Sequence, residues 1–232
     1  MEILAIIPAH NEAQNIEAVV DELVRVAPEV GYVVVNDGSA DDTAAICRRR
    51  GYHLIDLPLN LGLAGAVQAG LQYASRRGYD AAVQLDGDGQ HDPRCIGVLS
   101  QAMAGQGADI VIASRFLEAK KGRGLRMAGS RLLSLLIRLT TGAKITDPTS
   151  GMRLFSKAMA DEFAWNINYG PEPDTVAYLI RSGAKVVEAP AAMRPRQHGE
   201  SYLNALRSLA YMLNMCVSIV FIQWFRKREA RR

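Results

Sequence analysis

The sequence lacks the cysteine spacing that marks zinc sites and disulfide frameworks. It has only three cysteines, Cys47, Cys95 and Cys216, and their odd number and wide separation favour a reducing compartment. It also has no G-x-G-x-x-G after its first apolar run and no G-x-x-x-x-G-K-[ST], which argues against a dinucleotide cofactor or a P-loop. Met1 leads directly into Glu2 without a basic region, so we expect no secretory signal.

A strong excess of charge is also missing, because the formal net charge is only +3. Five basic residues lie between Arg226 and Arg232, beside a single acid, so the rest of the chain is close to neutral. Nucleic-acid-binding proteins more often have a basic face on the folded body, so we predict no nucleic-acid partner. A basic tail after an apolar run favours contact with a membrane surface instead.

What is present is an alternation of apolar runs and helical patterns in a chain of 232 residues, long enough for one sizeable core. The pattern predicts strands at 2–8, 32–35, 53–57, 80–85 and 109–113, and helices at 15–26, 43–50, 66–76 and 93–103. A loop is expected at 60–65. This alternation indicates an α/β fold with a doubly wound, mostly parallel sheet. Ligands of such sheets bind at the carboxyl ends of the strands.

The second half has longer loops and fewer strands. It predicts loops at 117–126 and 193–202, helices at 130–141 and 175–181, and strands at 154–155 and 185–190. An uncharged run follows at 208–225. We therefore divide the chain into a single domain over 1–202 and an apolar C-terminal helix with a basic tail over 203–232.

The most informative stretch is LDGDGQHDP at 85–93, where an apolar strand ends in two acids. Asp86 and Asp88 flank a glycine, and Gln90 adds a third side chain with an oxygen. Hard cations such as Mg²⁺ and Mn²⁺ prefer such oxygen ligands. A D-x-D pattern alone is common, and the acids could merely cap the next helix, for which Asp92 and Pro93 form an expected N-cap and first residue.

Further polar residues follow other predicted strands. Asn11 and Glu12 follow the first strand, Asp37 the second, and Arg115 the fifth. All should meet the two acids at one edge of the sheet. This gathering strengthens the interpretation as a metal and nucleotide site.

Six motifs together resemble the family 2 glycosyltransferases, most closely the polyprenol-phosphate sugar transferases of the dolichol-phosphate mannosyltransferase type. The motifs are IPAHNE (7–12), VNDGSADDT (35–43), NLGLAGA (60–66), LDGDGQHDP (85–93), ASR (113–115) and DPTSGMRLF (147–155). The resemblance implies a GT-A fold, inversion at the anomeric carbon, a UDP- or GDP-linked sugar donor, and Mg²⁺ or Mn²⁺. It also implies a polyprenyl phosphate acceptor.

The resemblance assigns roles to the residues that match. It implies donor contacts at Pro8, Asn11, Glu12, Asp37, Asp86, Arg126 and Arg196. It implies a metal site at Asp86, Asp88 and Gln90. It implies catalytic roles for Asp88, Arg115, Arg131 and Asp147, with the arginines holding phosphate groups. The chain departs from the pattern at Tyr202, where many relatives have a lysine.

The acceptor decides whether a general base is needed. A phosphate monoester is mostly ionised at neutral pH, whereas a sugar hydroxyl needs a carboxylate base. Asp147, Glu172 and Asp174 are candidates for that base, but they are equally typical of turns and helix caps. His10 and His91 are not expected to bind metal, because no second histidine has ligand spacing.

The apolar run at 208–225 would form a helix of about 27 Å, just short of a hydrocarbon core of about 30 Å. The polar residues in this run favour a helix that lies on the membrane surface. A true span would also place the basic tail on the far side of the membrane, against the positive-inside rule. Burial in a homo-oligomer, burial under a membrane partner subunit and a true span stay open. We expect a peripheral protein on the cytoplasmic face of the membrane.

The sequence thus predicts a metal-dependent hexosyltransferase that moves a sugar to undecaprenyl or dolichyl phosphate. The alternatives are a glycosyltransferase with a saccharide acceptor in cell-envelope polysaccharide synthesis, a nucleotidyltransferase and a non-catalytic membrane scaffold.

Overall fold

A seven-stranded sheet forms the centre of the molecule, in the order β3-β2-β1-β4-β6-β5-β7. The computed structural model describes residues 1–232 except 119–121, 123, 168–169, 196–204 and 222–232. The strands are β1 Ile3–Ala9, β2 Gly31–Asp37, β3 Leu54–Leu57, β4 Ala81–Gln84, β5 Ile110–Ser114, β6 Arg153–Ser156 and β7 Val186–Pro190. Only β6 runs antiparallel to its neighbours, β4 and β5. The predicted doubly wound, mostly parallel sheet is confirmed.

Helices cover both faces of the sheet, which explains why the strands are apolar without alternation. One face carries α1 Ile16–Val26, α2 Thr43–Arg50 and α4 Cys95–Gln106. The other carries α3 Gly62–Arg77, α6 Lys157–Trp165 and α7 Pro173–Arg181. All seven residues of β1 are buried. Its neighbour β2 is parallel, with Ile6 opposite Val33, so the carboxyl ends of these strands lie together.

Several helix positions differ from the sequence prediction. The helix predicted at 130–141 begins at Leu125, inside the predicted loop 117–126. The expected loop at 60–65 is mostly helix, because α3 begins at Gly62. The helix after the acidic turn begins at Cys95, because the Asp92 carboxylate accepts hydrogen bonds from the backbone and guanidinium of Arg94 and so closes a separate turn first. The pattern did not predict α6, which starts where the Ser156 side chain accepts from the Met159 backbone N–H.

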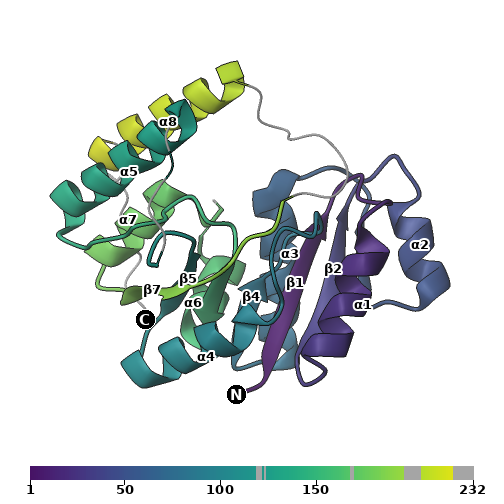
Figure 1. Ribbon diagram of the computed structural model, residues 1–232. Coiled ribbons are helices and arrows are strands. Elements are labelled where there is room, and N and C mark those ends of the chain that lie inside the picture. The colour runs from purple at the N-terminus through teal and green to yellow at the C-terminus, as the bar shows by residue number, and fades with distance from the viewer. Residues whose placement is uncertain (119–121, 123, 168–169, 196–204, 222–232) are drawn as a thin grey trace.

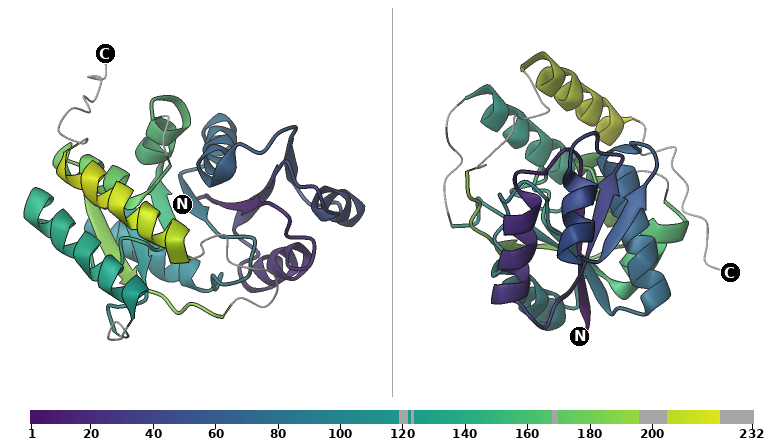
Figure 2. Two further views of the ribbon diagram at one scale, coloured as in Figure 1. Left: turned by 90° about the horizontal axis from the view of Figure 1, so that it is seen from above. Right: turned by 90° about the vertical axis from the view of Figure 1, so that its right-hand side faces the viewer.

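Two helices lie side by side over α7 at one end of the molecule, α5 Leu125–Thr141 and α8 Ala205–Val220 (Figures 1 and 2). Ile219 of α8 is fully buried in the main core. No helix in the described part of the chain is long and apolar enough to cross a membrane.

Two acids at the start of α7, Glu172 and Asp174, hold α8 in place. The Ser218 hydroxyl donates to Asp174 Oδ2 at 2.6 Å, and the Tyr211 hydroxyl donates to Glu172. Burial, with the charge of Glu172 as a second cause, raises the pKa of Tyr211 well above its usual range. Both candidate bases therefore accept a hydrogen bond from α8.

Candidate active site

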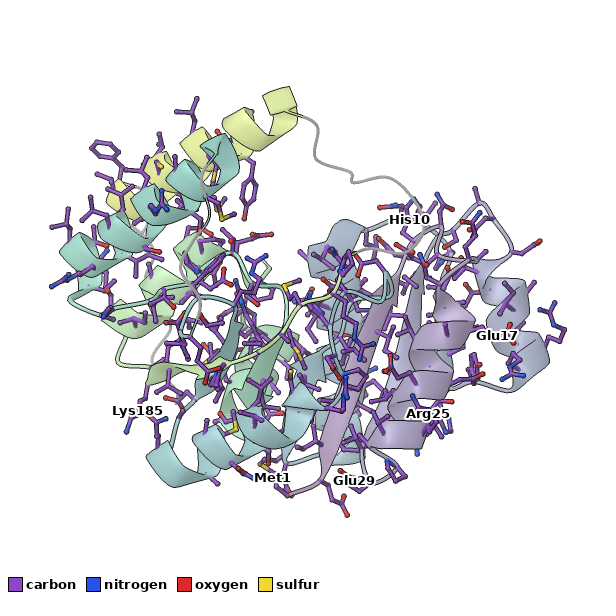
Figure 3. All side chains as sticks on the ribbon, viewed as in Figure 1. Met1, His10, Glu17, Arg25, Glu29 and Lys185 are labelled. Atoms are coloured by element: carbon purple, nitrogen blue, oxygen red, sulfur yellow. The ribbon has the colours of Figure 1, made fainter. Side chains whose placement is uncertain are left out.

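Polar residues meet at the carboxyl ends of β1, β2 and β4, which are neighbours in the sheet. Figure 3 shows His10 at this edge, opposite the end where Met1 leads into β1. The His10 Nδ1–H donates to the Asp37 backbone carbonyl at 2.8 Å. The Asp37 carboxylate, 3% exposed, accepts the Leu61 backbone N–H at 2.7 Å. Asp37 thus ties the start of α3 to the end of β2.

The turn after β1 is held by its own side chains. Asn11 has a positive φ of 57°, and its Oδ1 accepts the Ala40 backbone N–H at 2.8 Å. The Glu12 N–H donates to the Thr43 hydroxyl at 2.9 Å, and Glu12 Oε2 accepts the Asn15 amide at 2.6 Å. Asn11 and Glu12 therefore shape the turn beside Asp37, where the sequence predicts the nucleotide.

The two acids of the central turn lie directly beyond β4. A Cβ atom on Gly87 would lie 2.9 Å from the Pro8 carbonyl oxygen, so only glycine lets the turn pack against the end of β1. Asp88 Oδ1 accepts the Gln90 backbone N–H at 3.1 Å. Asp86 Oδ1 accepts the Gln84 amide at 2.8 Å. Both carboxylates are thus oriented by neighbours within this short segment.

His91 contacts the backbone of Asp86 and helps to fix its position, a role that was not predicted from the sequence. The Asp86 backbone N–H donates to His91 Nδ1 at 3.0 Å, which leaves Nε2 to carry the proton in a neutral ring. Nε2 lies 3.7 Å from Asp86 Oδ2 and has no hydrogen-bond partner among the described residues, although His91 is only 4% exposed. The geometry makes His91 a support of the acidic turn.

The segment from Asp147 to Arg153 reaches this turn from the second half of the chain. A Cβ atom on Gly151 would lie 2.8 Å from Asp86 Oδ2. Arg153 is buried and donates to the backbone carbonyls of Ser150 and Pro148 at 3.0 and 2.8 Å. Burial lowers the pKa of Arg153, while the nearby carboxylates of Glu172, Asp147 and Asp86 favour its charge. Arg153 was not among the residues predicted for the site, although its place within the DPTSGMRLF motif was a signal.

Arg115 and Asp147 form a bidentate ion pair. Arg115 Nε and Nη2 lie 2.6 and 2.7 Å from the two carboxylate oxygens, and the Arg115 backbone N–H donates to Asp147 as well. Asp147 is fully buried. Glu188 of β7 then holds the Asp147 segment by accepting the backbone N–H groups of Thr146 and Asp147, each at 2.7 Å. Asp147 is thus occupied in orienting Arg115, a poor arrangement for a general base.

Of the remaining predicted residues, only Gln90 is seen to lie in the acidic turn. Gln90 lies in the acidic turn, and its backbone carbonyl accepts the Arg194 N–H at 2.9 Å. Arg131 lies on α5 and donates to the Gly122 carbonyl at 2.9 Å. It lines a groove together with Phe116, and neither Asp86 nor Asp88 lines that groove. The Arg126 side chain and Arg196 lie outside the described residues.

The donor set fits a cation that a substrate helps to bind. Among the described residues no group of three or more His, Cys, Asp or Glu side chains forms a complete metal site. Asp86 and Asp88 offer two carboxylates on one turn, and Mg²⁺ is usually held by one or two carboxylates together with substrate phosphates. Fold and site together define an α/β protein whose sheet edge is suited to a divalent cation and a phosphorylated ligand.

The family is shown by comparison with known proteins. Residues 4–163 match the model of Glycosyl transferase family 2, and the chain belongs to that family. It is 31% identical over 218 residues to an undecaprenyl-phosphate mannosyltransferase of Micrococcus luteus, covering 88% of each chain. It is 29% identical to a polyprenol monophosphomannose synthase of Mycolicibacterium smegmatis, covering 87% of this chain and 80% of that one. The predicted family and glycosyltransferase class are confirmed.

A solved structure shows the same fold. Glucosyl-3-phosphoglycerate synthase from Mycobacterium tuberculosis, in complex with Mn²⁺, uridine diphosphate and phosphoglyceric acid, superposes with a TM-score of 0.71. The match is 18% identical and covers 96% of this chain and 78% of that one.

Proposed function

We propose that this glycosyltransferase moves one sugar from a nucleoside diphosphate-sugar to a polyprenyl phosphate, with Mg²⁺ or Mn²⁺ bound at Asp86 and Asp88. The observation that carries the proposal is the meeting of the acidic turn with the Asp147–Arg153 segment and its Arg115 ion pair. Anion- and cation-binding groups thus lie at one sheet edge. The curated relatives named above act on polyprenyl phosphates, which supports this acceptor.

At the donor end, the turns around Asp37 and Asn11 hold the nucleoside, and the acidic turn faces the diphosphate. When bound, the cation would act as a Lewis acid that offsets the charge developing on the leaving diphosphate. Asp88 and Asp86 would hold it, because their carboxylates are already oriented by Gln90 and Gln84.

At the acceptor end, Arg115 supplies a fixed positive charge. Its guanidinium is locked by Asp147 and retains 23% side-chain exposure, so it can still contact a phosphate. A phosphate monoester is mostly ionised at neutral pH and needs orientation more than deprotonation. The placement of Asp147, Glu172 and Asp174 in other contacts favours a reaction without a general base.

Access to a lipid acceptor would come through the outer face of α5 and α8. Both helices expose large apolar side chains there: Leu132, Leu135, Leu139, Leu213 and Val217. We propose that this α5–α8 face lies on the cytoplasmic surface of the membrane. Leu213→Glu with Val217→Glu, two positions 58% and 50% exposed, should reduce vesicle binding more than tenfold. Undiminished binding, or self-association through this face in solution, would refute that placement.

The test of the reaction is transfer of labelled sugar into organic-extractable lipid. UDP- and GDP-linked sugars would be assayed with undecaprenyl or dolichyl phosphate in detergent, with Mg²⁺, Mn²⁺ or chelator. We expect one donor to give a lipid product, and Asp88→Asn to lower the rate roughly 100-fold or more. A product on saccharide but not on lipid phosphate, or an Asp88→Asn rate equal to wild type, would contradict the proposal.

A further inference from the structure

The segment after β7 crosses the carboxyl edge of the sheet and contacts the acidic turn. Ala191 donates its backbone N–H to the Ser114 carbonyl, at the end of β5, at 3.0 Å. Met193 then forms an isolated antiparallel bridge with His91. Figure 1 shows this yellow-green stretch of chain running from β7 towards β1. We call residues 191–195 the strap, because they join the β5–β7 side of the sheet to the turn that carries the two acids.

Arg194 connects the strap to two other parts of the fold. Its Nη1–H donates to Glu22 Oε2 of α1 at 2.7 Å, and its Nη2 lies 2.9 Å from Asp92 Oδ2. Its backbone N–H donates to the Gln90 carbonyl at 2.9 Å. The three charged side chains are only partly exposed, at 30% for Arg194, 26% for Glu22 and 9% for Asp92. Solvent and salt therefore screen this network less than they screen an isolated surface ion pair.

The strap contacts the two residues that orient the acids. Gln90, whose carbonyl accepts a hydrogen bond from the strap, donates its own backbone N–H to Asp88 Oδ1 at 3.1 Å. His91, which pairs with the strap, accepts the Asp86 backbone N–H at 3.0 Å. A single residue thus links each acid to the strap, so a shift of the strap would move both acids.

We propose that Arg194 is a positioning residue for the metal site of the proposed reaction. By bridging Glu22 and Asp92, its guanidinium fixes the strap against the acidic turn. The turn then holds Asp86 and Asp88 at the spacing that a divalent cation and a diphosphate require. The inference rests on the proposed function, because it needs the two acids to bind a cation. Residues that hydrogen-bond to metal ligands from outside orient them, and their substitution typically lowers metal affinity about 10–100-fold.

The test is Mn²⁺ binding by the full-length protein. Mn²⁺ would be titrated with UDP or GDP present, and free Mn²⁺ would be measured by its electron paramagnetic resonance signal. Arg194→Gln loses both ion pairs but keeps the backbone bond to Gln90, so the Mn²⁺ concentration for half-saturation should rise about tenfold. Glu22→Gln removes one side of the bridge and should act in the same direction, with no further rise in the double variant. Effects that multiply in the double variant would contradict a shared bridge.

Arg94 supplies a matched control, because its guanidinium also pairs with Asp92, at 2.6 Å from Oδ2. Arg94 is only two residues from Asp92 in the sequence and its side chain is 67% exposed, so this pair does not tie the turn to another element. Arg94→Gln removes the same charge and should change the Mn²⁺ concentration for half-saturation by less than about twofold. Equal weakening in Arg94→Gln and Arg194→Gln would mean that the turn needs only local positive charge, and would overturn the role of the strap.

Hydrogen exchange in the metal-free protein gives a second readout. Arg194→Gln should speed exchange of the backbone amides of 85–92 and leave those of β1 unchanged, because only the turn loses its support. A lower melting temperature with unchanged Mn²⁺ binding would mean that Arg194 contributes only stability, and would overturn the inference.

Failure of this inference is distinguishable from failure of the proposed function. Wild-type protein that binds Mn²⁺ normally, beside an Arg194→Gln variant that binds it equally well, would refute the positioning role alone. Wild-type protein that binds no Mn²⁺ with either nucleotide and transfers no sugar would refute the proposed function, and the positioning role with it.

Discussion

The Arg115–Asp147 ion pair gives a sharp test of how the site works. Asp147 is fully buried and accepts three hydrogen bonds from Arg115. Asp147→Asn keeps the shape but removes the charge, leaving a largely buried guanidinium without its counter-ion. Breaking a buried pair in this way costs 3–5 kcal/mol, and the partial exposure of Arg115 places the expected loss at about 3 kcal/mol. For a chain of this length the melting temperature should fall by roughly 6–12 °C.

The same substitution should lower kcat/KM about 100-fold. Under the proposed function Arg115 binds the acceptor phosphate, and a displacement of such a group by about 1 Å costs that much. The assay is a double-mutant cycle with Arg115→Gln, measured at a temperature where every variant is folded. If Asp147 acts only by orienting Arg115, then each single variant and the double variant should lose activity to about the same extent. Losses that multiply in the double variant would refute the reasoning and restore Asp147 as a general base.

Three other predictions concern the acidic turn and its surroundings. Gly151→Ala would push a methyl group against the Asp86 carboxylate and should weaken Mn²⁺ activation about tenfold, whereas unchanged activation would contradict the contact. His91→Leu removes the acceptor of the Asp86 backbone N–H and should raise the Mn²⁺ concentration needed for activity about tenfold. His91→Asn should restore the wild-type requirement, because its side-chain oxygen can accept the same hydrogen bond. Equal behaviour of both variants would argue against this role. Hydrogen bonds from Arg94 lower the pKa of Asp92 to about 2, so the stability that ionised Asp92 contributes to the fold is complete above about pH 4 and is lost as the pH falls towards 2. In denaturant titrations, the Asp92→Asn variant should lack this acid-dependent loss of folding stability. A variant whose stability depends on pH as the wild type's does would contradict this prediction.

The sequence by itself determined the architecture and the acidic turn. Strands buried on both faces must be continuously apolar, so runs such as 2–8 indicated a parallel sheet with helices on both sides. Parallel strands place their carboxyl ends at one edge of the sheet, so the sequence alone predicts that Asp37 and Asp86 lie close together. The sequence predicted the first residues of helices less well. The Asp92 side chain accepts a hydrogen bond from Arg94 and closes a separate turn, so α4 begins later than predicted.

Only the tertiary structure decided what the second half contributes. Periodicity cannot show that Asp147 pairs with Arg115, 32 residues away in sequence, or that Glu188 holds the backbone between them. Nor can it show that Glu172 accepts a hydrogen bond from Tyr211 of α8, because a polar turn looks the same in sequence whichever partner it contacts. Such pairings depend on which segments the sheet order brings together, since β6 enters antiparallel between β4 and β5. Sequence patterns record the burial of each strand, whereas the contacts between distant segments exist only in the folded chain.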